Sequence, residues 1–170
     1  MLEIKNLTKH FPINKSQTVY ALDGVSFSVG KGRTLGIVGE SGCGKSTCAR
    51  TIMRIYEPTS GEIIVDGNNI ESLSNKQLKP FRKDMQMIFQ DPYASLNARM
   101  TVYDIIAEPL IAHNMYKSKA ERDDAIYHMI NKVGLTKEHA NRYAHEFSGG
   151  QRQRIGISRA LILNPSIIVC

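Results

Sequence analysis

An α/β fold is predicted for this chain of 170 residues, because apolar patterns typical of strands alternate with patterns of helical period. Residues 2–7 and 20–29 have the spacing of an antiparallel pair of strands. Residues 34–38 form a short apolar run that leads through a glycine-rich loop into residues 48–56, whose apolar side chains recur at helical spacing. The stretch 101–146 follows helical periods throughout, which predicts a helical subdomain inserted into the α/β core.

Turn signals mark the remaining elements of the fold. Residues 58–61 break the chain, and residues 62–66 and 85–89 are predicted strands. A helix is expected over residues 150–163, and the apolar run 167–169 follows it.

Two pairs of polar residues have the three-residue spacing of a helix cap. Thr101 with Asp104, and Ser118 with Glu121, each precede a stretch of helical period. Gly134 follows the second stretch, at a place where glycine commonly ends a helix. The sequence therefore predicts two capped helices in the helical subdomain.

Composition excludes several classes of protein. Hydrophobic residues make up 42% of the chain and charged residues 22%, the balance of a soluble globular protein, and no run approaches the roughly 18 apolar residues of a membrane span. The first residues lack the apolar core of a signal peptide, so a cytoplasmic protein is expected. The three cysteines form no CxxC pair, and the net charge of +6 is scattered. Neither a metal cluster nor a nucleic-acid partner follows.

A phosphate-binding loop lies between the predicted strand 34–38 and the helix after it. Its eight residues match GxxxxGK[ST]: Gly39, Glu40, Ser41, Gly42, Cys43, Gly44, Lys45 and Ser46. Glycines let the backbone N–H groups curl around an anion, and the helix adds the positive end of its dipole. Lys45 is expected to reach the β- and γ-phosphates, Ser46 to hold Mg²⁺, and Thr47 to contact the α-phosphate side. The motif predicts binding of Mg²⁺ and ATP, and by itself it fits kinases, GTPases, helicases, DNA-repair ATPases and transporter ATPases.

A second motif, FSGGQR, opens the helix predicted over 150–163. Ser148 and Gln151 have the spacing of a capping box, and Gly149 and Gly150 leave a helix N-terminus that is open to an anion. With the phosphate loop about a hundred residues earlier, the sequence resembles the ABC ATPase family in its signature motif. In that family two ATPase domains meet head to tail. The resemblance implies that Ser148, Gly149, Gly150 and Gln151 contact the γ-phosphate held by a second subunit.

Two more residues match functional positions of this family, in the same order along the chain. Tyr20 in VYALDGVSF matches the aromatic residue that stacks on adenine, although a tyrosine that merely points outward from a strand is the simpler alternative. Gln90 in MQMIFQDP matches the glutamine that ligates Mg²⁺ and senses the attacking water, and the alternative is a polar residue that ends a strand. The resemblance implies catalytic roles for Lys45 and Gln90 and metal contacts for Ser46 and Gln90.

The segment FQDPYASLN and the run HANRYAHEFSGGQRQRIGISRAL resemble the ATP-binding subunits of oligopeptide, dipeptide and nickel importers. The resemblance covers essentially the whole chain. It implies transmembrane permease subunits as partners, a solute-binding protein as an indirect partner, and a peripheral position on the cytoplasmic face of the cell membrane. Residues 93–100 are the expected contact with the permease. The alternatives are a nucleotide-binding fragment without hydrolysis and a soluble ABC ATPase that acts on nucleic acid.

The implied fold is a P-loop NTPase core of RecA-like type with N-terminal antiparallel strands. The expected division is 1–99 for the antiparallel and P-loop core, 100–147 for the helical subdomain, and 148–170 for the signature helix and the start of the Walker B strand. Residues 167–170 supply the four apolar positions of Walker B, and its two carboxylates are absent from the 170 residues. The family's next strand lies between the Walker B strand and the P-loop strand. An incomplete sheet and negligible hydrolysis by this chain alone are therefore expected.

Overall fold

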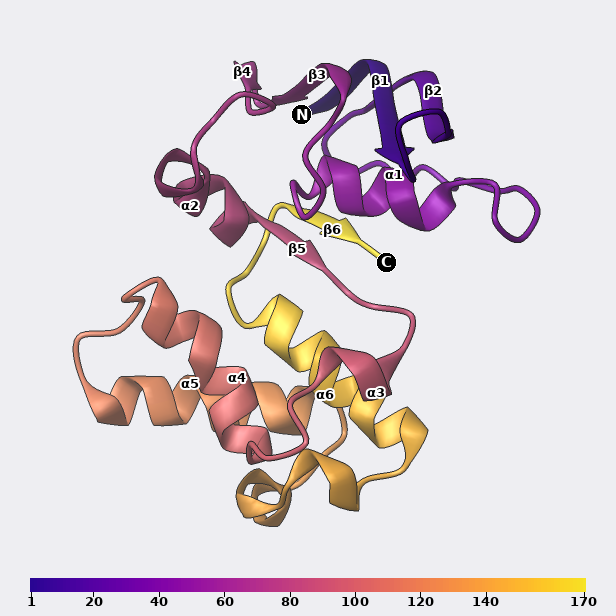
Figure 1. The fold of residues 1–170 in the computed structure, drawn as a ribbon. Helices are drawn as coiled ribbons and strands as arrows, with labels where there is room; N and C mark the ends of the chain where they lie inside the picture. The colour runs from indigo at the N-terminus through magenta and orange to yellow at the C-terminus, as the bar shows by residue number, and fades with distance from the viewer. The chain divides into compact units, whose positions relative to one another are not determined.

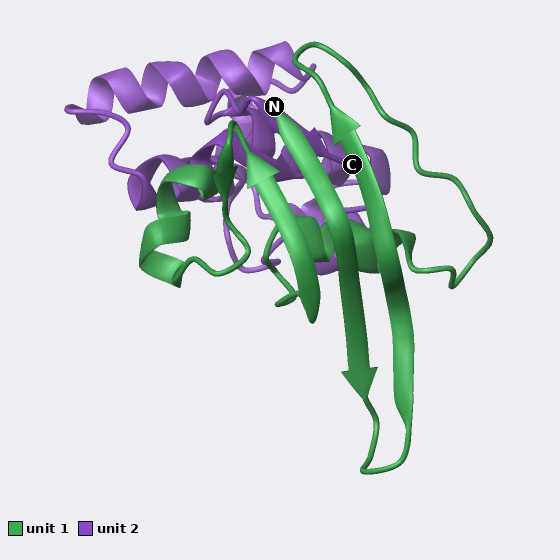
Figure 2. Cartoon of the chain, turned by 90° about the horizontal axis from the view of Figure 1, so that it is seen from above, with its two compact units in different colours: residues 1–82 green, residues 83–170 purple.

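A computed structural model describes residues 1–170, which form two compact units. The first unit is Met1–Arg82 and the second is Lys83–Cys170 (Figure 2). Helices and strands occur in both units, in the order labelled in Figure 1. No helix is both long enough and apolar enough to cross a membrane.

The first unit is built on an antiparallel sheet of four strands, in the order β2-β1-β3-β4. Its elements are β1 (Leu2–Pro12), β2 (Thr18–Val29), α1 (Lys45–Ile52), β3 (Ser60–Val65), β4 (Asn68–Asn69) and the start of α2 (Asn75–Asp84). Strand β1 pairs with both β2 and β3, and its inward residues Ile4 and Leu7 are almost completely buried. The predicted antiparallel pair and the predicted strand over 62–66 are confirmed, with longer strands than expected.

Residues 34–38 do not form the predicted strand. This segment runs without regular structure from β2 toward α1 (Figure 1), and the side chains of Leu35, Ile37 and Val38 are 45%, 47% and 92% exposed. A strand exists only where a neighbouring strand accepts and donates its ladder hydrogen bonds. Neither of the two sheets includes this segment, which is why its apolar alternation does not become a strand.

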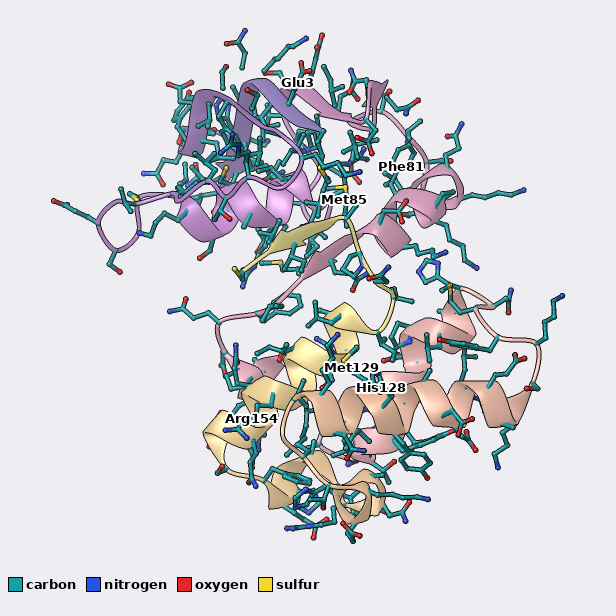
Figure 3. All side chains as sticks on the ribbon, turned by 180° about the vertical axis from the view of Figure 1, so that it is seen from behind. Glu3, Phe81, Met85, His128, Met129 and Arg154 are labelled. Atoms are coloured by element: carbon teal, nitrogen blue, oxygen red, sulfur yellow. The ribbon has the colours of Figure 1, made fainter.

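The second unit contains a two-stranded parallel sheet and a cluster of helices. Its elements are β5 (Met85–Met87), α3 (Pro92–Ser95), α4 (Val102–Ala112), α5 (Lys119–Lys132), η1 (Lys137–Asn141), η2 (Ala144–Glu146), α6 (Gly149–Leu161) and β6 (Ile167–Val169). Strands β5 and β6 pair in parallel, with Met85 opposite Ile167. Met85 is buried at the start of β5 (Figure 3). The strand predicted over 85–89 is confirmed in a shorter form.

The predicted caps are present in the helical region. The Thr101 side chain accepts the N–H of Asp104 at the start of α4, and the Ser118 side chain accepts the N–H of Glu121 at the start of α5. Gly134 has φ 75° and donates its N–H to the carbonyl of Asn131, which ends α5 as expected.

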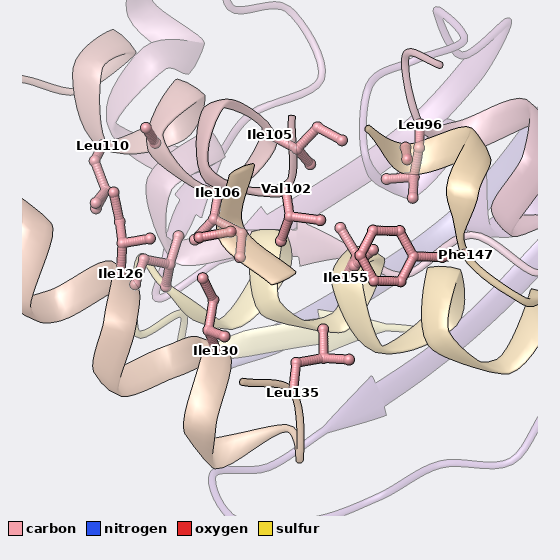
Figure 4. Close-up of a cluster of buried hydrophobic side chains, with 14 of the residues drawn as sticks. Leu96, Val102, Ile105, Ile106, Leu110, Ile126, Ile130, Leu135, Phe147 and Ile155 are labelled. Carbon is pink, nitrogen blue, oxygen red and sulfur yellow. The ribbon is translucent and has the colours of Figure 1, made fainter. Parts of the chain in front are cut away.

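One continuous apolar cluster holds the helical region together (Figure 4). It takes side chains from α4, α5, α6 and the connections between them. Its most deeply buried members, each no more than 1% exposed, are Val102, Ile105, Ile106, Leu110, Ile126, Ile130, Ala140 and Ile155. Burial of such side chains stabilises a fold by roughly 1.5–3 kcal/mol each relative to exposure.

Helix α4 offers a matched test of this cluster. We expect Ile106→Ala to lower the free energy of unfolding by about 2–5 kcal/mol, because it leaves a cavity at a fully buried site. Ile111→Ala on the same helix is the control, since that side chain is 55% exposed, and it should change the free energy by less than about 1 kcal/mol. Urea titrations followed by circular dichroism measure both values. Equal losses would show that the cluster is not the core of this region.

Candidate nucleotide site

The phosphate loop leads directly into α1. Gly44 is the residue before the helix and has a left-handed conformation with φ 96°. No side chain caps the N-terminus of α1, and the first turn carries no acidic residue. The first N–H groups of a helix have no partner inside the helix, and the helix dipole places partial positive charge there. The start of α1 is therefore arranged to receive an anion.

Gly44 also packs against the backbone of β2. A Cβ atom at this position would lie 2.3 Å from the carbonyl oxygen of Ala21, which is far inside van der Waals contact. Only glycine permits this approach at a positive φ. The contact fixes the end of the phosphate loop next to β2, one residue after Tyr20 in the chain.

The ammonium of Lys45 lies over the loop. Its Nζ donates to the carbonyl oxygens of Gly39 at 2.7 Å and Glu40 at 2.6 Å, and it lies 3.5 Å from the Sγ of Cys43. These contacts hold one positive charge at the opening formed by residues 39–45. The ammonium and the start of α1 both place positive charge beside the loop, which also contains the acidic residue Glu40.

The first turn of α1 separates exposed from buried side chains. Ser46 is exposed and Thr47 is half-buried, whereas Cys48 is only 3% exposed. Burial raises the pKa of the Cys48 thiol, so this group stays protonated near neutral pH. The Ser46 hydroxyl is thus accessible at the loop, while Cys48 belongs to the packing beneath it.

Tyr20 presents its ring to solvent at the same end of the first unit. The side chain is 67% exposed, and its ring makes an edge contact with His10 at a centroid distance of 4.4 Å. His10 lies opposite Tyr20 in the β1–β2 register, and its backbone N–H donates to Thr59 Oγ1 at 2.9 Å. Sequence reasoning missed His10, and only the strand register could have indicated it. His10 supports the tyrosine ring from one side while most of the ring stays open.

Gln90 and the signature residues belong to the second unit. Gln90 is exposed between β5 and α3. Ser148 caps α6: its Oγ accepts the N–H of Gln151 at 3.4 Å, and Gln151 Oε1 accepts the N–H of Ser148 at 3.1 Å. The capping box predicted for these two residues is therefore present. Nothing lies within 4 Å of a Cβ built at Gly150, so this turn is open.

The contacts that three aromatic and basic side chains make near the signature were not predicted, although Tyr93 begins the segment 93–100 expected to contact the permease. Tyr93, Arg152 and Arg159 join α3 to α6 through a ring contact and a hydrogen bond. Arg152 and Arg159 stand seven residues apart, a spacing that places both on one side of a helix. That spacing was the available signal, but nothing local in the sequence identifies their partners on α3.

The structure thus places Tyr20 beside the phosphate loop, residues 39–47, and places Gln90 in the same unit as residues 148–151. The phosphate loop packs against β2 through a glycine and leads into a helix that has no side-chain cap. This combination is characteristic of P-loop nucleotide-binding proteins. Residues 22–170 match the family described as ABC transporter, and the chain belongs to this family.

Curated relatives match the chain from end to end. The oligopeptide transport ATP-binding protein OppF of Bacillus subtilis (strain 168) is 58% identical over 170 residues, which are 99% of this chain and 55% of that protein. The dipeptide transport ATP-binding protein DppF of Lactococcus lactis subsp. cremoris (strain MG1363) is 48% identical over 171 residues, or 99% and 55% of the two chains. The chain therefore spans about half the length of the curated relatives it matches.

A solved structure has the same fold. The ATP-binding cassette MJ0796, described as the dimeric structure of a post-hydrolysis state bound to ADP and Pi, superposes with a TM-score of 0.89 at 32% identity. The match covers 99% of this chain and 72% of that one. It confirms the α/β fold of P-loop ATPase type that the sequence predicts.

Two glycines of the phosphate loop allow a matched test of its geometry. We expect Gly44→Ala to abolish anion binding and to lower stability, because the new methyl group would clash with the Ala21 carbonyl. Gly42→Ala is the control: φ is 81°, yet nothing lies within 4 Å of the added Cβ, so only a backbone cost of about 1 kcal/mol is expected. Binding of a fluorescent ATP analogue and thermal melting measure the two effects. Similar losses in both variants would contradict the importance of the Ala21 contact.

Proposed function

We propose that this chain is the ATP-binding, energy-coupling part of an ABC importer for peptides or a related small solute. The observation that carries the proposal is the uncapped start of α1 with the Lys45 ammonium held over the loop. The names of the relatives, which are oligopeptide and dipeptide transport ATP-binding proteins, support the class of solute.

The phosphate loop binds the triphosphate in this proposal. Residues 39–47 wrap the phosphates with backbone N–H groups, and Lys45 exchanges its contacts with the loop carbonyls for the β- and γ-phosphate oxygens. Tyr20 stacks on the adenine, since its ring is open to solvent and supported by His10.

Ser46 of the first unit and Gln90 of the second are the proposed protein ligands of Mg²⁺. Ser46 offers an exposed hydroxyl at the first turn of α1, and Gln90 offers an exposed amide. Magnesium prefers oxygen ligands and keeps several of its own waters and substrate phosphates, so few protein donors suffice. The ion would neutralise the phosphate charge. Lys45 orients the triphosphate, and Gln90 orients the attacking water.

A second ATPase subunit completes the site. Ser148, Gly149, Gly150 and Gln151 of one subunit contact the γ-phosphate bound by the other, head to tail. The γ-phosphate then bridges the two subunits, so its loss by hydrolysis favours separation. The dimeric description of the structurally similar cassette MJ0796 supports the pairing of two such subunits.

Transport requires membrane partners. In the proposal, residues 93–100 contact transmembrane permease subunits at the cytoplasmic face of the membrane, and a solute-binding protein delivers the solute to the permease. The segment starts at Tyr93, whose side chain is 62% exposed and thus accessible to a partner.

Calorimetry with Mg-ATP tests the proposed binding site. We expect Lys45→Ala to weaken ATP binding at least about tenfold, because it removes a charge-assisted contact to phosphate. Tyr20→Ala should weaken ATP by about tenfold through lost stacking, yet leave inorganic tripolyphosphate binding unchanged. Lys31→Ala, at an exposed lysine outside the loop, is the control. Absence of ATP uptake by the well-folded unmodified chain would remove the proposed function.

A further inference from the structure

Tyr93 lies against the signature turn of its own subunit. The guanidinium carbon of Arg152 is 4.1 Å from the centre of the Tyr93 ring, in cation–π contact. A Cβ built on Gly149 would lie 3.8 Å from both Cε2 and the hydroxyl oxygen of Tyr93, which is ordinary van der Waals distance. The ring thus faces the position where a side chain at Gly149 would stand, and it contacts the first arginine that follows this glycine.

Tyr93 is held by the short helix α3, which is fixed at both ends. Asp91 Oδ1 accepts the N–H of Tyr93 at 2.8 Å and caps the start of α3. At the other end, Arg159 Nη1 donates to the carbonyl of Ser95 at 2.7 Å. Burial lowers the pKa of Arg159, and the nearby carboxylate of Glu108 opposes that shift, so the guanidinium remains charged at neutral pH. The position of Tyr93 is therefore determined by α6 as well as by its own helix.

Arg152 is held on its other side by the loop before the signature. Its Nη2 donates to the carbonyl of His145 at 2.8 Å, while its Nε is buried without a hydrogen-bond partner. The hydrogen bond to His145 and the contact with the Tyr93 ring together hold the Arg152 guanidinium in place, although one of its N–H groups has no partner. Arg152 thus links the Tyr93 ring to the carbonyl of His145, three residues before Ser148.

We propose that Tyr93 and Arg152 are a positioning pair that fixes the orientation of the signature turn, residues 148–151, for the γ-phosphate bound by a second subunit. The inference rests on the proposed function. Neither Tyr93 nor Arg152 belongs to the phosphate loop, residues 39–47; the pair acts through the Tyr93 ring, which faces Gly149, and through α6, which carries Arg152. Its removal should weaken ATP-dependent dimer formation and leave ATP binding by the single subunit unchanged.

The test uses the longest natural form of the protein with a non-hydrolysable ATP analogue and Mg²⁺. Tyr93→Leu keeps apolar volume but removes the ring, and it should weaken analogue-dependent dimerisation by up to about thirty-fold, which is the limit reached if the signature turns of both subunits lose the whole support of this contact. Tyr93→Phe keeps the ring and should dimerise like the unmodified protein. Tyr116→Leu, at another exposed tyrosine of the helical region, is the matched control. Sedimentation velocity measures the dimer, and calorimetry measures analogue binding to the monomer.

Arg152→Met provides a second, independent arm. If the two side chains act as a pair, the double variant Tyr93→Leu with Arg152→Met should lose no more dimer than either single variant. Unchanged dimerisation in Tyr93→Leu, or equal losses in Tyr93→Leu and Tyr93→Phe, would overturn the proposed pair. Failure of the unmodified protein to bind the analogue at all would instead overturn the proposed function and the pair with it.

Discussion

The close packing of Gly44 against the Ala21 carbonyl is the constraint on which the nucleotide site depends. The contact requires a residue without a Cβ, and it joins the end of the phosphate loop to the first part of β2. Tyr20 precedes Ala21, and Lys45 follows Gly44, so one backbone contact sets the spacing between the proposed adenine and phosphate ligands. A loop that was only flexible would have to be ordered by the ligand, at a cost in affinity. Here the chain supplies that order itself.

Structural features that depend on neighbouring residues were predicted correctly from the sequence, whereas features that depend on residues far apart in the chain were not. The caps at Thr101, Ser118 and Ser148 were predictable because each cap forms between residues three apart. The apolar run 34–38 failed as a strand, since a strand needs a neighbour that periodicity cannot reveal. His10 was missed for the same reason, because its contact with Tyr20 arises from the register of two strands. The roles of residues 39–47 and 148–151 in nucleotide binding remain predictions from motif and geometry.

The two proposed phosphate contacts differ in how their helix ends are satisfied. Helix α1 has no side-chain cap, so its N–H groups are available to the triphosphate from the outset. Helix α6 is already capped by Ser148 and Gln151, which satisfy each other's backbone N–H groups. Loss of a cap costs a helix about 0.5–2 kcal/mol. A γ-phosphate from a second subunit must therefore offset that cost, or use the N–H of Gly149 and Gly150 without disturbing the cap. The start of α1 thus has free N–H groups for a phosphate, whereas the start of α6 has some of its N–H groups already bonded.

Three arginines join the signature helix α6 to neighbouring segments. Arg152 donates to the carbonyl of His145 in η2, Arg154 Nη1 lies 3.5 Å from the carbonyl oxygen of Gly134 after α5, and Arg159 donates to the carbonyl of Ser95 in α3 (Arg154 is labelled in Figure 3). Because these carbonyls belong to three different segments, the helix is held along its length and not at its first turn alone. In the proposed dimer, the γ-phosphate therefore meets a turn whose supporting helix is already held in place, so binding has less of the chain to order.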